Sequence, residues 1–221
     1  IISGINPYAS QYAIKRGESF KTPEFIFTLS NKGTGYASRS LHDWARNYQI
    51  KNGKGERNTL LNNWEATYFD FDDEKIDKLA DCAADLGIEL LVLDDGWFGH
   101  RNDDNSSLGD WVINTQKLKK GLNGVADSAH RRGLKFGLWF EPEMVSEDSE
   151  LYRVHPDWTL HVPDYPSSYS RHQLVLDLSR EEVRDYIVTS VSKVLHAAPV
   201  DYVKWDFNRH LSEAFSAALP A

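Results

Sequence analysis

The chain has 221 residues, 41% hydrophobic and 26% charged, so it can bury a sizeable core and intrinsic disorder is excluded. Its 25 basic and 33 acidic residues give a net charge of −8 without a basic run, which disfavours binding to nucleic acid or to an anionic membrane. No stretch reaches the ~18 to 20 apolar residues of a membrane span, and residues 1–16 lack the order of a secretory signal, so we expect a soluble, cytoplasmic protein.

Two further features of the composition bear on function. The only methionine is Met144, so we expect the chain to begin inside a larger polypeptide. Seven tryptophans and ten tyrosines are more aromatic surface than a core of this size requires. Sugar-binding proteins use such rings as platforms for the apolar faces of pyranoses, although core packing explains any single ring more simply.

The first 34 residues differ from the rest of the chain. Gln11 to Lys15 and Glu24 to Leu29 are short β-type runs with a turn-like segment between them. We therefore interpret residues 1–34 as the end of a β-domain. Residues 35–58 are predicted to form a helix over Tyr36 to Gln49 and then a polar linker.

From residue 59 onward strand-like and helix-like segments alternate, which indicates a parallel sheet with crossover helices. The predicted main strands are Trp64 to Phe69, Ile88 to Leu93, Leu134 to Phe140 and Asp201 to Phe207, with a short one at Val175 to Leu178. The predicted helices are Glu74 to Leu86, Lys117 to Arg132, Glu181 to Ala197 and one that begins near Asn208. Cys82 falls on an apolar stripe of the first of these helices, which predicts a buried thiol rather than a nucleophile.

The alternation predicts an α/β fold. About four strand–helix units in residues 59–221 amount to the front half of a (β/α)8 barrel, or TIM barrel, whose complete form needs ~250 residues. An open doubly wound sheet is the competing architecture, but no glycine-rich phosphate loop follows the first predicted strand.

Polar residues follow the predicted strands at the ends where a parallel barrel builds its active site. Because side chains alternate along a strand, Lys204, Asp206 and Asn208 share one face of the fourth strand. An ammonium near Asp206 favours its ionised form, the state in which a carboxylate acts as a nucleophile. A structural ion pair between Lys204 and Asp206 is the alternative.

Asp94 and Asp95 end the second strand, where adjacent carboxylates are costly to bury unless each accepts hydrogen bonds. Sugar hydroxyls supply such donors, whereas a helix cap, a turn or a metal site are the alternatives. No metal is predicted, because compact ligand spacing is missing around the histidines His100, His155, His161 and His172. Trp64 and Trp139 fit a stacking platform or the core equally well, and Arg171 reads by pattern alone as a solvated loop charge.

These motifs closely resemble those of the α-galactosidases of glycoside hydrolase family 36, over nearly the whole chain. They are LDDGWFG from Leu93, LGDW from Leu108, WFEPEM from Trp139 and KWDFNR from Lys204. The family is built from an N-terminal β-supersandwich, a central (β/α)8 barrel and a C-terminal β-domain. The resemblance implies that residues 1–34 end the first domain and that residues 59–221 form the front half of the second.

The resemblance also implies a reaction. Asp206 is expected to be the nucleophile, which forms a galactosyl-enzyme ester during retaining hydrolysis of terminal α-D-galactosides such as melibiose and raffinose. Asp94 and Asp95 are expected to bind galactose hydroxyls, and Lys204 and Asn208 to hold the ring. The same pocket is expected to be lined by Trp64, Trp139 and Arg171. No cofactor is implied, and the expected partners are α-galactoside oligosaccharides.

The retaining mechanism needs a second carboxyl group ~5 to 5.5 Å from the nucleophile, as acid and then base. In the family this aspartate lies on a later strand, beyond Ala221. We therefore expect the chain alone to be weak or inactive, and to form a homo-oligomer or to need the missing half of the barrel. The alternatives are a non-catalytic, self-associating half-barrel or sugar-binding module, and a relative that transfers galactose to another sugar.

Overall fold

The structure, a computed structural model, describes residues 4, 13–212 and 215–219. The chain divides into two compact units, Ile1–Arg57 and Asn58–Ala221. In the described part of the first unit, helix α1 (Thr34–Trp44) follows an irregular segment and continues as a π-helical turn over Ala45–Gln49. No residue of α1 is buried.

The β-type runs expected in the first unit are wrong over the described residues. Residues 13–33 contain no strand, so Glu24 to Leu29 and the end of Gln11 to Lys15 are irregular, while Gln11 and Tyr12 lie outside the described residues. A β-type sequence becomes a strand only when a partner completes its ladder of hydrogen bonds, and none pairs with residues 13–33 within the described chain.

The second unit contains a parallel sheet of four strands. These are β1 (Leu60–Asn62), β2 (Leu90–Leu93), β3 (Lys135–Phe140) and β6 (Tyr202–Trp205). Their spatial order, β1-β2-β3-β6, follows the chain without reversal. A doubly wound sheet reverses its strand order at a switch point, so this order agrees with a barrel and not with the competing architecture. The predicted α/β class is confirmed.

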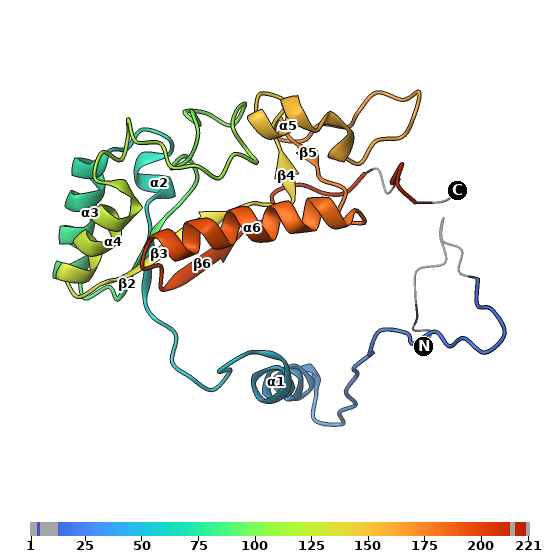
Figure 1. The fold of residues 1–221 in the computed structure, drawn as a ribbon. Helices are drawn as coiled ribbons and strands as arrows, with labels where there is room; N and C mark the ends of the chain where they lie inside the picture. Colours follow the sequence, from blue (N-terminus) through green and yellow to red (C-terminus); the bar gives the residue numbers. More distant parts are fainter. Residues whose placement is uncertain (1–3, 5–12, 213–214, 220–221) are drawn as a thin grey trace. The chain divides into compact units, whose positions relative to one another are not determined.

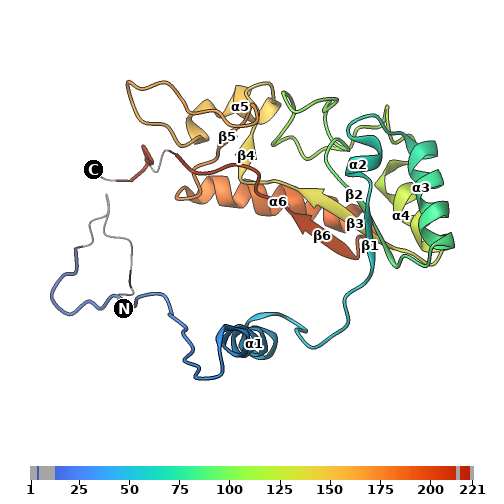
Figure 2. The same cartoon turned by 180° about the vertical axis from the view of Figure 1, so that it is seen from behind.

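Helices pack on one face of this sheet. They are α3 (Asp73–Asp85), α4 (Gly121–Arg131) and α6 (Glu181–Ala197). α6 lies in front of β3 and β6 in Figure 1 and behind them in Figure 2, where the sheet is seen from its other face. The outward-facing side chains of the strands, such as Leu91, Phe136 and Leu138, join the apolar faces of the helices in one core. Burying that core stabilises the unit at roughly 25 cal/mol per Å² of apolar surface.

On the inner face of the sheet, side chains of the two neighbouring strands lie close to Gly137. A Cβ atom there would lie 2.8 Å from Cγ2 of Val92 and 3.1 Å from Cδ1 of Tyr202. Glycine therefore fits here, because the side chains of Val92 and Tyr202 occupy the space that a larger residue would need.

The first strand is not where the sequence analysis placed it. Leu60–Asn62 forms β1, whereas Trp64 to Phe69 begins with helix α2 (Trp64–Thr67). The cause is local, because Oδ1 of Asn62 accepts the backbone N–H of Trp64 at 2.8 Å and turns the chain into a helix. The aromatic residues that suggested a strand pack instead against one another: the Trp64 ring lies 5.0 Å from the Phe69 ring, edge to face.

Two further expectations are wrong. Residues 208–212 form no helix, so the helix predicted from Asn208 is not present in the described residues. Cys82 is exposed rather than buried, because the buried face of α3 carries Ile76, Ala80 and Ala83 and the helical period turns Cys82 away from it.

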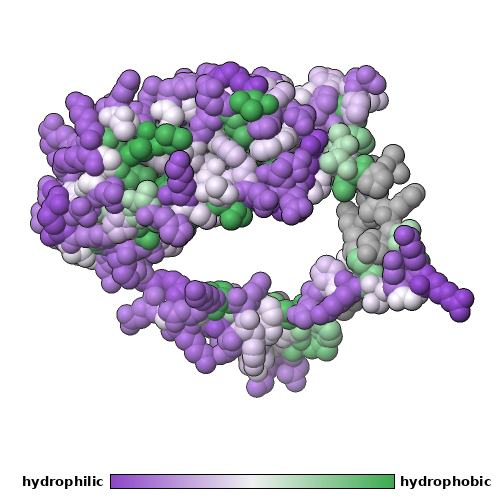
Figure 3. All heavy atoms as spheres, viewed as in Figure 1, coloured by the Kyte–Doolittle hydropathy of each residue, from purple (hydrophilic) through white to green (hydrophobic). Residues whose placement is uncertain are grey.

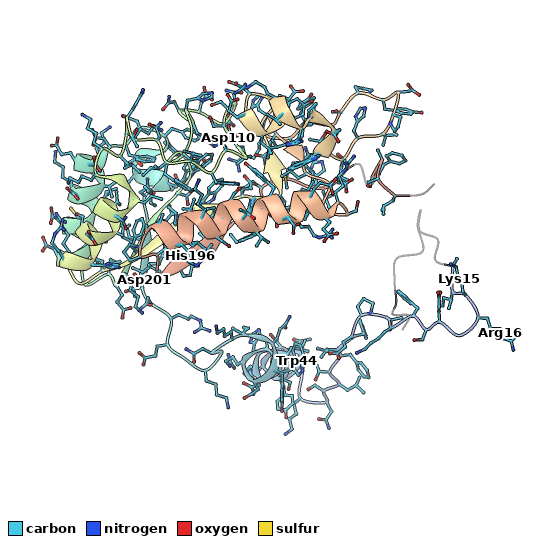
Figure 4. The ribbon with its side chains drawn as sticks, viewed as in Figure 1. Lys15, Arg16, Trp44, Asp110, His196 and Asp201 are labelled. Carbon is cyan, nitrogen blue, oxygen red and sulfur yellow. The ribbon has the colours of Figure 1, made fainter. Side chains whose placement is uncertain are left out.

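Smaller elements follow β3. Strands β4 (Met144–Val145) and β5 (Leu174–Val175) form an antiparallel pair. The short strand predicted at Val175 to Leu178 overlaps β5 only at Val175. Helix α5 (Glu150–Val154) precedes a 3-10 turn over Pro156–Trp158. Asp110, which is labelled in Figure 4, accepts hydrogen bonds from the backbone N–H groups of Glu150 and Leu151 and so anchors the start of α5.

An apolar cavity of about 550 Å³ lies between α4, α6 and the loop Trp111 to Ile113. Figure 3 shows apolar side chains gathered on this side of the molecule within a mostly polar surface. Within the described residues, no helix is long and apolar enough to cross a membrane.

The loop after β2 is held by two cations, the buried Arg101 and the half-buried Lys117. Arg101, 1% exposed, donates from Nε and Nη2 to the two carboxylate oxygens of Asp95 at 2.6 and 2.8 Å. Lys117 Nζ donates to the backbone oxygens of Phe69, Gly96 and Arg101 at 2.8 to 3.0 Å. These contacts fix the chain that leaves β2, and with it the position of the two aspartates at the strand end.

We predict that Arg101→Gln lowers the free energy of unfolding by about 3 to 5 kcal/mol, because it leaves the Asp95 carboxylate buried without its cation. The matched variant Arg153→Gln removes two ion pairs, to Asp148 and Glu150, whose cation is 44% exposed, and we expect it to cost less than about 1 kcal/mol. Urea unfolding followed by circular dichroism measures both losses. Equal losses would contradict the prediction.

The loss in Arg101→Gln should shrink toward mildly acidic pH. Burial raises the pKa of the Asp95 carboxyl group even against the opposing effect of Arg101, and removing Arg101 raises this pKa further. As the pH falls, the folded variant therefore binds a proton at Asp95 before the unfolded chain does, which increases its stability relative to neutral pH. The same unfolding series at two pH values tests this, and a loss that grows on acidification would refute it.

Candidate active site

The four parallel strands end at one edge of the sheet, and their inner faces carry a group of polar side chains there. The register pairs Asn62 with Val92 and Trp139 with Lys204. Since every second residue faces the same side, Asp94 and Asp206 continue the inner face beyond these positions. The inner group at this edge is Asn62, Asp94, Trp139, Lys204 and Asp206.

Asp206 lies just after β6, and its carboxylate is held from several sides. Oδ2 accepts the indole N–H of Trp139 at 3.0 Å, and Oδ1 accepts the backbone N–H of Phe207 at 3.0 Å. Lys204 Nζ lies 3.7 Å from Oδ2. Partial burial opposes ionisation, but the hydrogen bonds from Trp139, Asn208 and the Phe207 backbone and the charge of Lys204 outweigh it and lower the pKa of Asp206.

Lys204 is shared between two carboxylates. Its Nζ donates to Oδ2 of Asp94 at 2.7 Å, closer than its approach to Asp206. Asn62 Nδ2 donates to the same Asp94 oxygen at 2.5 Å, and the backbone N–H of Asp95 donates to the other at 2.9 Å. Asp94 is only 3% exposed, and these three donors supply the hydrogen bonds that its buried carboxylate needs.

Asp95 has a different partner from Asp94. Both of its carboxylate oxygens are engaged by Arg101, as described above, and its side chain points to that guanidinium rather than to Lys204. The two adjacent carboxylates are therefore held apart by separate cations.

Asn208 joins Asp206 to a further buried carboxyl group. Its side chain lies near the carboxylates of both Asp206 and Glu141 and acts to lower the pKa of each. Its backbone N–H donates to Oε1 of Glu141 at 2.5 Å. Burial raises the pKa of Glu141, and the nearby charge of Asp206 acts in the same direction.

Two of the predicted pocket residues, Trp64 and Arg171, have no contact with Asp206 among the described hydrogen bonds and ion pairs. Trp64 lies in α2, and its backbone N–H donates a hydrogen bond to Asn62. The Trp64 ring, however, packs edge to face with the rings of Tyr68 and Phe69. Arg171 lies in the loop before β5, exposed and with a positive φ of 53°. Among the described contacts, no hydrogen bond or ion pair joins Arg171 to Asp206.

Asn62, in the inner group, and Glu141, which accepts the backbone N–H of Asn208, were given no role from the sequence. Glu141 directly follows a buried strand, as Asp94 does, and this position was the available signal. Asn62 ends a strand of three residues, too short to show alternation.

The aspartate at the other end of β6 illustrates why strand ends matter. Asp201, labelled in Figure 4, accepts hydrogen bonds from Nε2 of His130 at 2.7 Å and from the backbone N–H of Phe136 at 2.9 Å. It precedes the strand, whereas Asp206 follows it, so only Asp206 lies with the polar group. Within the ranges that the structure describes, no cluster of three or more His, Cys, Asp or Glu side chains could hold a metal ion.

Comparison with known proteins places this geometry in a family. The Melibiase family model matches residues 19–221. The α-galactosidase AgaA of Geobacillus stearothermophilus is 55% identical over 98% of this chain and 30% of its own length. The α-galactosidase Mel36A of Lactobacillus acidophilus is 47% identical over 99% of this chain and 30% of its own length.

Solved structures agree with the sequence relatives. A glycoside hydrolase family 36 AgaA variant in complex with raffinose superposes with a TM-score of 0.94 at 55% identity, over 98% of this chain and 30% of that one. A second AgaA variant, in complex with 1-deoxygalactonojirimycin, gives a TM-score of 0.84 at 56% identity, over 86% and 27%. The predicted part of a (β/α)8 barrel is thereby confirmed.

The chain spans about 30% of the length of these two curated relatives. The match of the family model nevertheless covers the sheet, its helices and the whole polar group at the strand ends. The chain therefore belongs to the melibiase family.

Proposed function

We propose that this chain carries the nucleophile and part of the galactose pocket of an α-galactosidase. The observation that carries the proposal is the Asp206 carboxylate, whose pKa is lowered by a ring of donors at the carboxyl ends of the strands. A carboxylate nucleophile must be ionised at the pH of the reaction, and this environment favours that form. The relatives named α-galactosidases support the choice of substrate.

The reaction we propose is retaining hydrolysis in two displacements. A carboxylate oxygen of Asp206 bonds to the anomeric carbon of galactose while the glycosidic bond breaks and its oxygen takes a proton from a general acid. Water then attacks the same carbon, gives a proton to the group that acted as acid, and releases galactose and the free carboxylate of Asp206. Terminal α-D-galactosides such as melibiose and raffinose are the proposed substrates, and raffinose is bound in the structure of an AgaA variant.

The other residues have proposed roles in binding. Asp94 and Asp95 accept hydrogen bonds from galactose hydroxyls, with Lys204 and Asn208 next to the ring. Asp94 is the better supported of the two acids, because it shares Lys204 with the nucleophile. Trp64, Trp139 and Arg171 remain proposed wall residues of the pocket.

We propose that the general acid comes from outside this chain, since the resemblance assigns it to a later strand. A self-associating half-barrel, a sugar-binding module and a galactosyl transferase are the alternatives, and the α-galactosidase relatives do not favour them. Homo-oligomerisation and a cytoplasmic location stay predictions.

A mechanism-based galactosyl fluoride should label Asp206, because fluoride leaves with little acid assistance and so tests the nucleophile in this chain itself. Peptide mass spectrometry locates the adduct. We expect Asp206→Asn to abolish labelling and Asp201→Asn, at the other end of β6, to retain it. An adduct on any other residue would disprove the assignment.

Hydrolysis of p-nitrophenyl α-galactoside by this chain alone should be at least about 100-fold slower than by AgaA, because general acid–base catalysis contributes roughly 10² to 10⁴-fold. A colorimetric assay of both proteins at equal concentration measures the ratio. Hydrolysis at the AgaA rate that disappears in Asp206→Asn would show that the chain contains its own acid.

The rate of Asp206 labelling should fall only at pH values below the ordinary pKa of an aspartate, because the lowered pKa of Asp206 keeps its carboxylate ionised as the pH decreases. In Lys204→Met the pKa of Asp206 rises, so the acid limb of the rate profile moves to higher pH. The control Lys120→Met, which removes a surface partner of Asp77, should leave the limb in place. A limb that stays unchanged in Lys204→Met would refute the proposed effect of the ammonium.

A further inference from the structure

The ladder of backbone hydrogen bonds between β3 and β6 ends at Asp206. The backbone N–H of Asp206 donates to the carbonyl oxygen of Phe140 at 2.8 Å. The next residue, Phe207, leaves its side chain 48% exposed and so provides little packing. A nucleophile at the end of a strand therefore depends on whatever holds the residues that follow it.

Glu141 holds them. It is the residue after Phe140, it is 1% exposed, and its Oε1 accepts the backbone N–H of Asn208 at 2.5 Å. The same oxygen accepts Nε2 of Gln173 at 3.2 Å. A side chain thus continues the pairing of β3 with the β6 segment for two residues beyond the last backbone bond.

Asn208 also lies next to the nucleophile, and the residue after it, Arg209, is held by further hydrogen bonds. The Asn208 side chain lies near both Glu141 and Asp206 and acts to lower the pKa of each carboxyl group, so the residue whose backbone Glu141 holds is also a neighbour of the nucleophile. On the other side, Arg209 Nη1 donates to the backbone oxygens of Gln173 and Ser168 at 2.6 and 3.0 Å. Gln173 and Arg209 are themselves buried.

We propose that Glu141 is a positioning residue for Asp206, which it orients through the backbone of Asn208. This inference rests on the proposed function and adds to it a residue that does not touch the sugar. Displacing a reacting group by about 1 Å costs up to about 100-fold in rate, so a clamp two residues from the nucleophile has a measurable effect.

A pair of variants separates the length of the Glu141 side chain from its charge. Glu141→Gln keeps the length and the Oε1 acceptor but removes the charge, whereas Glu141→Asp keeps the charge and withdraws the oxygen by one methylene. Glu143→Asp is the matched control, because Glu143 lies in the same motif but accepts the indole N–H of Trp205 at 2.9 Å, on the other face of β6.

The first measurement is amide hydrogen exchange of the chain, which does not depend on activity. We expect exchange at Asn208 to accelerate about tenfold or more in Glu141→Asp and to stay within about threefold of wild type in Glu141→Gln and Glu143→Asp. Wild-type exchange at Asn208 in Glu141→Asp would overturn the clamp. Failure of the galactosyl fluoride to label Asp206 would overturn the proposed function but leave this measurement decisive for Glu141.

The second measurement separates positioning from a loss of the pocket. In Glu141→Asp we expect the maximal rate of labelling to fall about 10- to 100-fold, with the half-saturating concentration of the galactosyl fluoride within about twofold of wild type. Glu141→Gln should restore most of the rate. A fall in Glu141→Gln with none in Glu141→Asp would assign the effect to charge and refute positioning, and an equal change in both kinetic constants would indicate a merely structural role.

Discussion

Parallel pairing of β1, β2, β3 and β6 is the constraint on which the polar group depends. Strands that run in the same direction end at the same edge of the sheet, so residues far apart in the chain meet there. Lys204 and Asp94 are separated by 110 positions but lie 2.7 Å apart. The apolar core beneath the helices fixes the strands, and the strands fix where the charges lie.

The strongly periodic parts of the chain could be predicted from the sequence, and the locally capped parts could not. The helix Glu181–Ala197 and the strand within Ile88 to Leu93 have long apolar patterns, and the structure contains both. Trp64 to Phe69 failed because one side-chain hydrogen bond from Asn62 overrides the preference of its aromatic residues for strands. Hydrophobic periodicity indicates which face of an element is buried, but it does not reveal a single side-chain hydrogen bond that starts a helix.

The same limit applies to the candidate site. Alternation along β6 correctly grouped Lys204 with Asp206, and the structure places Lys204 within 3.7 Å of that carboxylate. Alternation could not reveal that Asp95 is engaged by Arg101, because the loop that returns Arg101 to the strand end has no periodic pattern. Two neighbouring carboxylates tolerate burial here because each has its own cation.

The sharing of Lys204 has a consequence for the timing of the proposed reaction. While Asp206 is a free anion, the ammonium serves two acceptors, at 2.7 Å on Asp94 and 3.7 Å on Asp206. Once Asp206 becomes a neutral ester, it attracts the Lys204 ammonium less strongly, and Asp94 is then the only charged partner of Lys204 in this group. In the proposed reaction, formation of the ester would therefore leave Lys204 paired with Asp94, and the return of the Asp206 anion on deacylation would restore the shared arrangement.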